Sequence, residues 1–195
     1  MMLQPITMVI LAGGQGTRIG GDKGLQLLHG RTLIAWVLDA IRNQSDEVLI
    51  SANGGRDEYA GLGYPVIADQ MSGWAGPLAG LQSALRYAHH EWVASVSCDT
   101  PFLPKDLIGR LYAAINMAAA EAAVAVVEGR RQPTIALYRK SVLPKLDTYL
   151  NGGERKVGAW LDTLQVCEVV FDDADAFINI NTSEELASAN QISKI

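Results

Sequence analysis

Strand-like and helix-like segments alternate along this chain, and the alternation limits its fold more than any other feature of the sequence. The predicted strands cover residues 6–12, 48–50, 64–68 and 92–97. Each is an apolar run that stops at a polar or glycine-rich group, as strands buried on both faces do. Segments with helical periodicity lie between them. The pattern predicts an α/β fold with a mostly parallel central sheet.

Two later apolar runs, residues 123–127 and 134–138, flank a polar stretch and predict a small antiparallel hairpin region. Near the C-terminus, Thr182 and Glu185 have the spacing of a capping box, which predicts a last helix. The 195 residues suit one domain with a full-sized core. We therefore expect residues 1–195 to form a single Rossmann-like, three-layer domain.

Composition and charge exclude several classes of protein. Hydrophobic residues make up 49% and charged residues 19% of the chain, as in an ordinary globular protein. No apolar run approaches the ~20 residues that cross a bilayer, and the N-terminus does not resemble a signal peptide. Two cysteines without metal-ligand spacing indicate reduced thiols. A net charge of −5 argues against nucleic-acid binding. We expect a cytoplasmic monomer without a membrane or nucleic-acid partner.

Polar groups follow the first four predicted strands at the point where each strand ends. They are Gly13-Gly14, Asn53, Asp69 and Asp99. Open parallel sheets bind ligands beyond the carboxyl ends of their strands. We therefore expect these groups to converge on one cleft.

The glycine-rich segment 11–23 follows the first predicted strand directly. Closely spaced glycines let main-chain N–H groups approach a phosphate, and Arg18 and Lys23 add positive charge to the same loop. The segment is not a P-loop, because Asp22 breaks that motif after its second glycine. It is not a dinucleotide fingerprint, because Ile19 stands at the third glycine position. A plain surface turn is the alternative to a phosphate-binding loop.

Several motifs together resemble those of the nucleoside-triphosphate transferase superfamily. Within that superfamily the sequence is similar to the molybdenum cofactor guanylyltransferase branch, the MobA type, from about residue 6 to 190. The stretches that carry the resemblance, in family order, are Leu11–Arg18, Ile19–Gly24, Gly76–Leu81, Cys98–Pro104 and Asn179–Thr182. Methionine is expected where this chain has Ile19, and this departure affects no catalytic group.

The resemblance implies that the protein transfers GMP from GTP to the terminal phosphate of molybdenum-molybdopterin and releases pyrophosphate, with Mg²⁺ as cofactor. It implies that the main chain of Leu11, Ala12 and Gly13 contacts the nucleotide. Arg18 and Lys23 would neutralise charge on the α-phosphate and the leaving pyrophosphate, as such charge dominates phosphoryl-type transfer. For Lys23 the alternative is a solvated surface lysine.

Asp99 stands at the end of an apolar run, where an unpaired carboxylate would be costly to bury. A magnesium ion that bridges phosphate oxygens would remove this cost, because carboxylate oxygen is a hard ligand. Asp99 is therefore the predicted metal ligand and a predicted catalytic residue. The alternative is an aspartate that caps a helix beginning near Pro104.

Asn53 and Asp69 match positions that contact the guanine nucleotide in the family, although either could instead form a turn. The stretch that begins at Gly76 corresponds to one that lies against the base and ribose in the wider superfamily, or it is a plain helix start. Asn179 and Asn181 lie two apart in an extended segment, so both point to one face.

The acceptor side is the less defined half of the predicted site. Either the two asparagines or the polar loop Arg130–Gln132 could hold the pterin ring or its phosphate, and the asparagines could also add to the metal shell. Strand-edge and surface-loop roles are the alternatives for both groups.

Two other functions are compatible with these motifs. One is a cytidylyltransferase, or another nucleotidyltransferase, that acts on a different acceptor. The other is a non-catalytic nucleotide-binding protein, which would not need both Lys23 and Asp99. Proteins that insert molybdenum or carry the cofactor follow as partners only from the resemblance.

Overall fold

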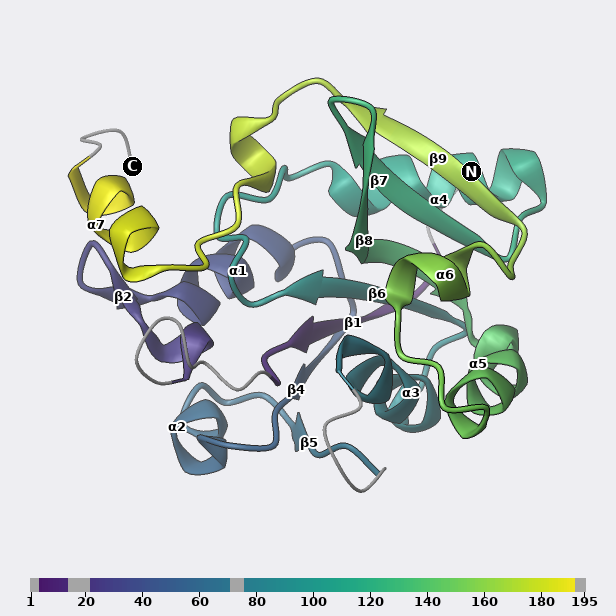
Figure 1. Ribbon diagram of the computed structural model, residues 1–195, viewed down its shortest axis with the longest axis horizontal. Helices are drawn as coiled ribbons and strands as arrows, with labels where there is room; N and C mark the ends of the chain where they lie inside the picture. Colours follow the sequence, from purple (N-terminus) through teal and green to yellow (C-terminus); the bar gives the residue numbers. More distant parts are fainter. Residues whose placement is uncertain (1–3, 14–21, 71–75, 192–195) are drawn as a thin grey trace.

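The computed structural model describes residues 4–13, 22–70 and 76–191, and the structural statements below concern these residues. A seven-stranded sheet forms the centre, in the order β5-β4-β1-β6-β8-β7-β9 (Figure 1). Its strands are β1 (Ile6–Leu11), β4 (Glu47–Ser51), β5 (Val66–Ile67), β6 (Trp92–Ser97), β7 (Ala122–Val127), β8 (Arg130–Arg139) and β9 (Val166–Phe171). Among these strands β8 alone runs against its neighbours. The predicted α/β fold with a mostly parallel sheet is confirmed.

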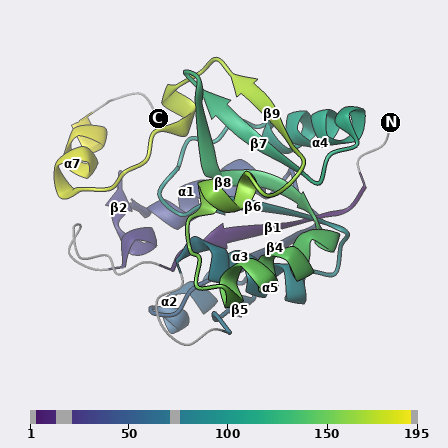
Figure 2. The same cartoon turned by 45° about the vertical axis from the view of Figure 1, so that its right-hand side comes forward.

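Helices cover both faces of the sheet, which gives the predicted three layers. The helices are α1 (Leu33–Ile41), α2 (Arg56–Ala60), α3 (Pro77–Tyr87), α4 (Leu107–Ala118), α5 (Leu143–Asn151), α6 (Val157–Leu161) and α7 (Ser183–Gln191). The buried side chains of α1, α2 and α4 share one core cluster, and those of α3, α5 and α6 share the cluster on the opposite face. Figure 2 shows α3, α5 and α6 together in front of the sheet. None of the described helices has the length and apolar character needed to span a bilayer.

The central strand β1 is buried along its whole length, because both of its faces are covered. Met8 and Ile10 point into the α1–α4 cluster, whereas Val9 and Leu11 point into the α3–α5–α6 cluster. Successive side chains of a strand alternate between its faces, so a strand between two helical layers needs apolar residues at every position. This explains why the run from residue 6 has no polar interruption apart from Thr7, whose hydroxyl donates to Glu47.

The predicted hairpin exists as β7 and β8, which pair antiparallel inside the main sheet rather than beside it. The polar stretch between them is shorter than predicted. Arg130–Gln132 belongs to β8, and the turn is made by Glu128 and Gly129, both at positive φ. The prediction of a polar loop at Arg130–Gln132 was therefore wrong. The β8 backbone continues to pair with β7 as far as Val127 opposite Arg130, so polar side chains did not end the strand.

Several elements were not predicted. They are α2, α5, α6, β9, and a separate two-stranded ribbon formed by β2 (Leu27–Leu28) and β3 (Arg31–Thr32). The ribbon turns at His29 and Gly30, both at positive φ, which is the backbone of a tight two-residue hairpin. The last helix was predicted correctly. Glu185 N–H donates to Thr182 Oγ1, and Thr182 N–H donates to Glu185 Oε2, so the capping box forms.

The parallel strands end at one edge of the sheet, and this edge collects the segments that matter below. In Figure 1 the arrowheads of β1 and β6 point to the side where β2, α2 and α7 lie. Helix α3 packs closely over the ends of β1 and β4. A Cβ added to Gly80 would lie 2.4 Å from Ser51 Oγ and 3.0 Å from Leu11 Cδ2. Glycine at this position lets the first turns of α3 lie directly on the strand ends.

We predict that Gly80→Ala destabilises the protein by about 1–3 kcal/mol, because the added methyl group overpacks the contact with Ser51. Gly109→Ala is the matched control, since Gly109 also lies in a helix and an added Cβ would meet no atom within 4 Å. That substitution should be neutral or stabilising by up to ~1 kcal/mol through helix propensity. Equilibrium unfolding in urea measures both changes. Equal behaviour of the two variants would contradict the close packing of α3.

Candidate active site

Three segments far apart in the sequence meet at the side chain of Lys23. Its ammonium group donates to Asp99 Oδ2 and to Asn181 Oδ1, across sequence separations of 76 and 158 residues. Lys23 begins the short 3₁₀ turn η1 (Lys23–Leu25), and Asp99 follows the end of β6 by two residues. The Lys23 side chain is 23% exposed and forms an ion pair with Asp99, so it is not a solvated surface lysine.

Asp99 is 6% exposed, and its carboxylate pairs with the ammonium group of Lys23 rather than with the N-terminus of a helix. Helix α4 begins at Leu107, and its N-cap residue is Asp106. The helix-capping alternative for Asp99 is therefore wrong. A carboxylate buried to this degree needs a positive or hydrogen-bonding partner, and Lys23 supplies it.

The segment 178–182 runs alongside the end of β6 and carries both predicted asparagines. Ile180 N–H donates to the carbonyl of Asp99 at 3.0 Å, and Thr100 Oγ1 donates to Asn179 Oδ1 at 2.8 Å. Ile180 is 1% exposed and packs in an apolar cluster with Leu28 and Leu33. The buried isoleucine turns the asparagines on either side of it toward the end of β6, as the extended spacing predicts.

Asn53 and Asp69 form a second polar pair at the same edge of the sheet. Asn53 Nδ2 donates to Asp69 Oδ2 at 2.7 Å, and Asp69 N–H donates to Asn53 Oδ1 at 3.0 Å. These residues follow β4 and β5, which are neighbouring parallel strands. A Cβ added to Gly13 would lie 3.8 Å from Asn53 Nδ2, so the end of β1 is adjacent to this pair.

Some main-chain groups at the end of β1 already form hydrogen bonds to neighbouring strand ends. Ala12 N–H donates to Ser51 O at 2.8 Å, and Cys98 N–H donates to Leu11 O at 3.2 Å. Leu11 and Ala12 are buried, whereas Gly13 is exposed. Of the three residues predicted to contact a nucleotide through the main chain, Gly13 is thus the most accessible. Gly76 has φ +69° and is the N-cap residue of α3, which lies over the same strand ends.

Two predicted groups do not join this arrangement. Arg18 lies outside the described residues. Arg131 forms ion pairs away from this site, with Asp162 and with Glu168 of β9, at 2.6 Å each. The hydrogen bonds to Glu168 and Asp162 raise the pKa of Arg131, and its charge is already balanced. The structure does not bring Arg130–Gln132 to Lys23 or Asp99 by any contact among the described residues.

Sequence reasoning missed the two residues that brace the Lys23 turn. The hydroxyl of Tyr59 donates to the carboxylate of Asp22, and Asp22 Oδ1 also accepts from Gly24 N–H at 3.3 Å. An aspartate directly before Lys23 and two residues before Gly24 could have indicated a capped turn at this point. Nothing in the local sequence around Tyr59 pointed to this contact.

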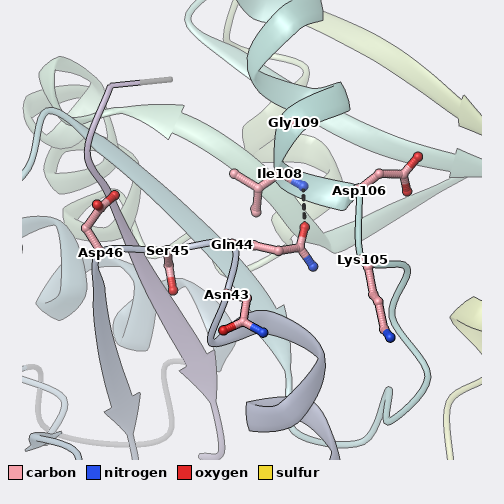
Figure 3. Close-up of a pocket in the computed structure, with 8 residues that line it drawn as sticks. All are labelled: Asn43, Gln44, Ser45, Asp46, Lys105, Asp106, Ile108 and Gly109. Atoms are coloured by element: carbon pink, nitrogen blue, oxygen red, sulfur yellow. Dashed lines mark hydrogen bonds between the residues drawn. The ribbon is translucent and has the colours of Figure 1, made fainter. Parts of the chain in front are cut away.

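A polar hollow of about 330 Å³ lies away from these groups, where α1 ends and α4 begins (Figure 3). The Gln44 side chain spans it by donating to Pro104 O at 2.9 Å and accepting from Ile108 N–H at 3.0 Å. Asp46, on its rim, immediately precedes β4 and so lies at the amino ends of the parallel strands. The hollow contains none of the predicted site residues, and Gln44 joins two helices there.

Comparisons with known proteins identify the family of the chain. Residues 8–166 match the MobA-like NTP transferase domain. A molybdenum cofactor guanylyltransferase of Burkholderia ambifaria is 47% identical over 193 residues, which cover 94% of each chain. One of Cupriavidus pinatubonensis is 44% identical over 187 residues, which cover 93% of this chain and 94% of the relative.

Solved structures share the fold over nearly the whole chain. Molybdopterin-guanine dinucleotide biosynthesis protein A from Archaeoglobus fulgidus has a TM-score of 0.80 at 28% identity, covering 95% of this chain and 97% of that one. A 2-C-methyl-D-erythritol 4-phosphate cytidylyltransferase from Thermus thermophilus has a TM-score of 0.74 at 22% identity, over 98% of this chain and 100% of that one, and shows the fold alone. By domain match and by identity to its relatives, this chain belongs to the MobA-like NTP transferase domain family.

Proposed function

We propose that this protein transfers GMP from GTP to the terminal phosphate of molybdenum-molybdopterin. The products are the guanine dinucleotide form of the cofactor and pyrophosphate. Relatives between 43% and 47% identical, matched over 93% or more of the chain, are named molybdenum cofactor guanylyltransferases. The single observation that carries the proposal is the meeting of Lys23, Asp99 and Asn181 at the carboxyl edge of a parallel sheet.

The chemistry needs little from the protein beyond positioning and charge. A phosphate monoester has a second pKa near ~6, so the acceptor is mostly a dianion at neutral pH and attacks without a general base. One acceptor oxygen forms a bond to the α-phosphorus of GTP as the bond to the β-phosphate oxygen breaks, and the pair of electrons leaves with pyrophosphate. Lys23 would neutralise the negative charge that develops on the phosphates, which is the largest contribution expected in such a site.

The residues present fit a magnesium ion. Asp99 Oδ2 and Asn181 Oδ1 already converge on one cation, the ammonium group of Lys23, and both are the hard oxygen donors that Mg²⁺ prefers. The described residues contain no group of three or more His, Cys, Asp or Glu side chains able to form a protein cage. Magnesium bound through one carboxylate and substrate phosphates does not need such a cage. When bound, it supplies Lewis-acid neutralisation of phosphate charge.

The Asn53–Asp69 pair supports the choice of a guanine nucleotide. A carboxylate can accept hydrogen bonds from both N1–H and the exocyclic amine of guanine, and cytosine offers no such pair of donors side by side. Asn53 Nδ2 donates to the Asp69 carboxylate at 2.7 Å, and Asn53 Oδ1 accepts from the Asp69 main-chain N–H at 3.0 Å. The carboxylate is therefore oriented before a ligand arrives. Gly13 and Gly76 would border the nucleotide at the strand ends.

On the acceptor side, Asn179 and Asn181 remain the best candidates to contact the pterin phosphate, because they flank the buried Ile180 beside Asp99. Arg131 is a weaker candidate, since two carboxylates already balance its charge. Cys98 and Cys167 are both free thiols, which suits a reducing, cytoplasmic compartment. Association with molybdenum-insertion or cofactor-carrier proteins, and the monomeric state, stay predictions from the sequence.

Asp99→Asn should lower the rate of pyrophosphate release from GTP and molybdenum-molybdopterin at least ~100-fold, because it removes the carboxylate that would hold magnesium. GTP binding in the absence of metal should remain detectable by isothermal titration calorimetry. Asp106→Asn is the matched control, since Asp106 is an exposed aspartate and should tolerate the change without loss of rate. A near-normal rate for Asp99→Asn would refute its role.

Lys23→Ala should lower kcat by about tenfold or more, as expected for the loss of a charge that stabilises the transition state. Lys105→Ala, at an exposed lysine, should leave kcat unchanged. Steady-state kinetics with GTP as the varied substrate separates kcat from KM. If Lys23→Ala behaves like the control, Lys23 has no part in the reaction.

With GTP and CTP offered in parallel, the protein should incorporate GMP and little CMP, and Asp69→Asn should reduce this preference by about tenfold or more. The asparagine amide cannot accept two hydrogen bonds from guanine as the carboxylate can. Radiolabelled product analysis measures both rates. Preferential transfer of CMP would favour the cytidylyltransferase alternative, and release of no pyrophosphate from either nucleotide would favour a non-catalytic binding protein.

A further inference from the structure

Tyr59 is a buried tyrosine of the short helix α2, and its hydroxyl reaches Asp22 at the start of the Lys23 turn. Its side chain is fully buried, with 0% exposure, and its hydroxyl donates to the carboxylate of Asp22. Asp22 immediately precedes Lys23 and caps the turn η1 by accepting from Gly24 N–H at 3.3 Å. The hydrogen bond from Tyr59 therefore acts on the residue that sets the start of the Lys23 turn.

Two glycines allow α2 and the Lys23 turn to approach so closely. A Cβ on Gly24 would lie 2.5 Å from the Tyr59 hydroxyl oxygen and 3.3 Å from Cys98 Cβ. Gly55 is the N-cap residue of α2 at φ +57°, and its Cβ would lie 3.0 Å from Asp22 Oδ2. Asp22, which is half-buried, thus lies between the start of α2 and the turn and contacts both.

A purely space-filling role does not account for the hydroxyl. Burial raises the pKa of Asp22 and also raises the pKa of Tyr59, so both groups lose solvation where they meet. Phenylalanine would fill the same volume without this cost. The Tyr59 hydroxyl hydrogen-bonds to Asp22, the carboxylate nearest to Lys23 in sequence. The ammonium group of Lys23 donates to Asp99 and Asn181.

We propose that Tyr59, acting through Asp22, is a positioning residue that holds Lys23 in place for nucleotidyl transfer. The proposal rests on the proposed function and adds to it a residue that does not touch substrate. The helix that carries Tyr59 begins three residues after Asn53, so it also connects the Asn53–Asp69 pair to the Lys23 turn. Misplacement of a catalytic group by about 1 Å can slow such a reaction by about 100-fold.

Tyr59→Phe should lower kcat about tenfold and leave the KM for GTP within about twofold, because the charge that Lys23 would neutralise develops in the transition state. Tyr138→Phe is the matched control. Tyr138 is equally buried, and its hydroxyl has no hydrogen-bond partner among the residues described. That variant should keep kcat within about twofold of wild type. An unchanged kcat in Tyr59→Phe would overturn the proposal.

Double variants test whether Tyr59 acts through Lys23. In the Lys23→Ala background, Tyr59→Phe should change kcat by less than about twofold, since the group that it positions is already gone. Asp22→Ala should resemble Tyr59→Phe, whereas Asp22→Asn should retain most of the rate, because the amide oxygen can still accept from Tyr59 and Gly24. Independent, multiplicative losses for Tyr59→Phe and Lys23→Ala would overturn the proposal.

A readout without substrate separates this proposal from the proposed function. Acetic anhydride modifies accessible amines, and mass spectrometry gives the rate at Lys23 relative to the exposed Lys105. We expect this ratio to rise about threefold or more in Tyr59→Phe and to stay unchanged in Tyr138→Phe. If wild type releases no pyrophosphate, the proposed function fails, and the labelling ratio still decides whether Tyr59 holds Lys23. Equal ratios in Tyr59→Phe and wild type would refute the positioning role.

Discussion

The contact between the Lys23 ammonium group and the buried Asp99 carboxylate is the interaction on which the rest of the site depends. It joins the turn at Lys23 to the end of β6, two parts of the chain that are 76 residues apart in sequence. Without the lysine, Asp99 would be an uncompensated charge at 6% exposure, which is costly to bury. With it, the Asp99 carboxylate and the Asn181 amide oxygen face a common point, the ammonium group of Lys23, and the proposed function would place phosphate and a divalent cation beside it. The same pairing that compensates the buried charge therefore also fixes where the lysine and the carboxylate lie relative to each other.

This contact is possible because the strands that lead to it are parallel and adjacent. β1, β4 and β6 pair in parallel around the centre of the sheet, so the residues that follow them emerge at one edge. Segment 178–182 closes that edge from the C-terminal part of the chain, through the hydrogen bond from Ile180 N–H to Asp99 O. Gly80 lets α3 lie on the ends of β1 and β4, on the face of the sheet that α3, α5 and α6 cover. The sheet edge thus brings a lysine, a carboxylate and an amide together from three distant parts of the chain.

Much of the fold could be predicted, and the errors have physical causes. β1 and β6 were predicted almost to the residue because strands buried on both faces are continuous apolar runs with sharp ends. α2, α6, β2 and β3 have two to five residues, which is too short for a period to be recognised. Arg130–Gln132 was wrongly assigned to a loop because polar residues there suggested a turn, whereas β8 continues through them by pairing with β7. The sequence, together with the family resemblance, singled out five residues of the site: Lys23, Asp99, Asn53, Asp69 and Asn181. It did not single out Tyr59.

The sequence by itself determined the class of the molecule: an α/β fold with closely spaced glycines after the first strand and polar residues at the ends of the others. These properties are encoded locally, in hydrophobic period and in the spacing of glycines and charges, so they can be recognised without coordinates. Only the tertiary structure decided which of the polar residues meet. That Asn181 reaches Lys23, that Tyr59 reaches Asp22, and that Arg131 pairs with Glu168 and Asp162 depend on strand order and on how helices lie on the sheet. Such contacts join segments many residues apart, and no local pattern in the chain specifies them.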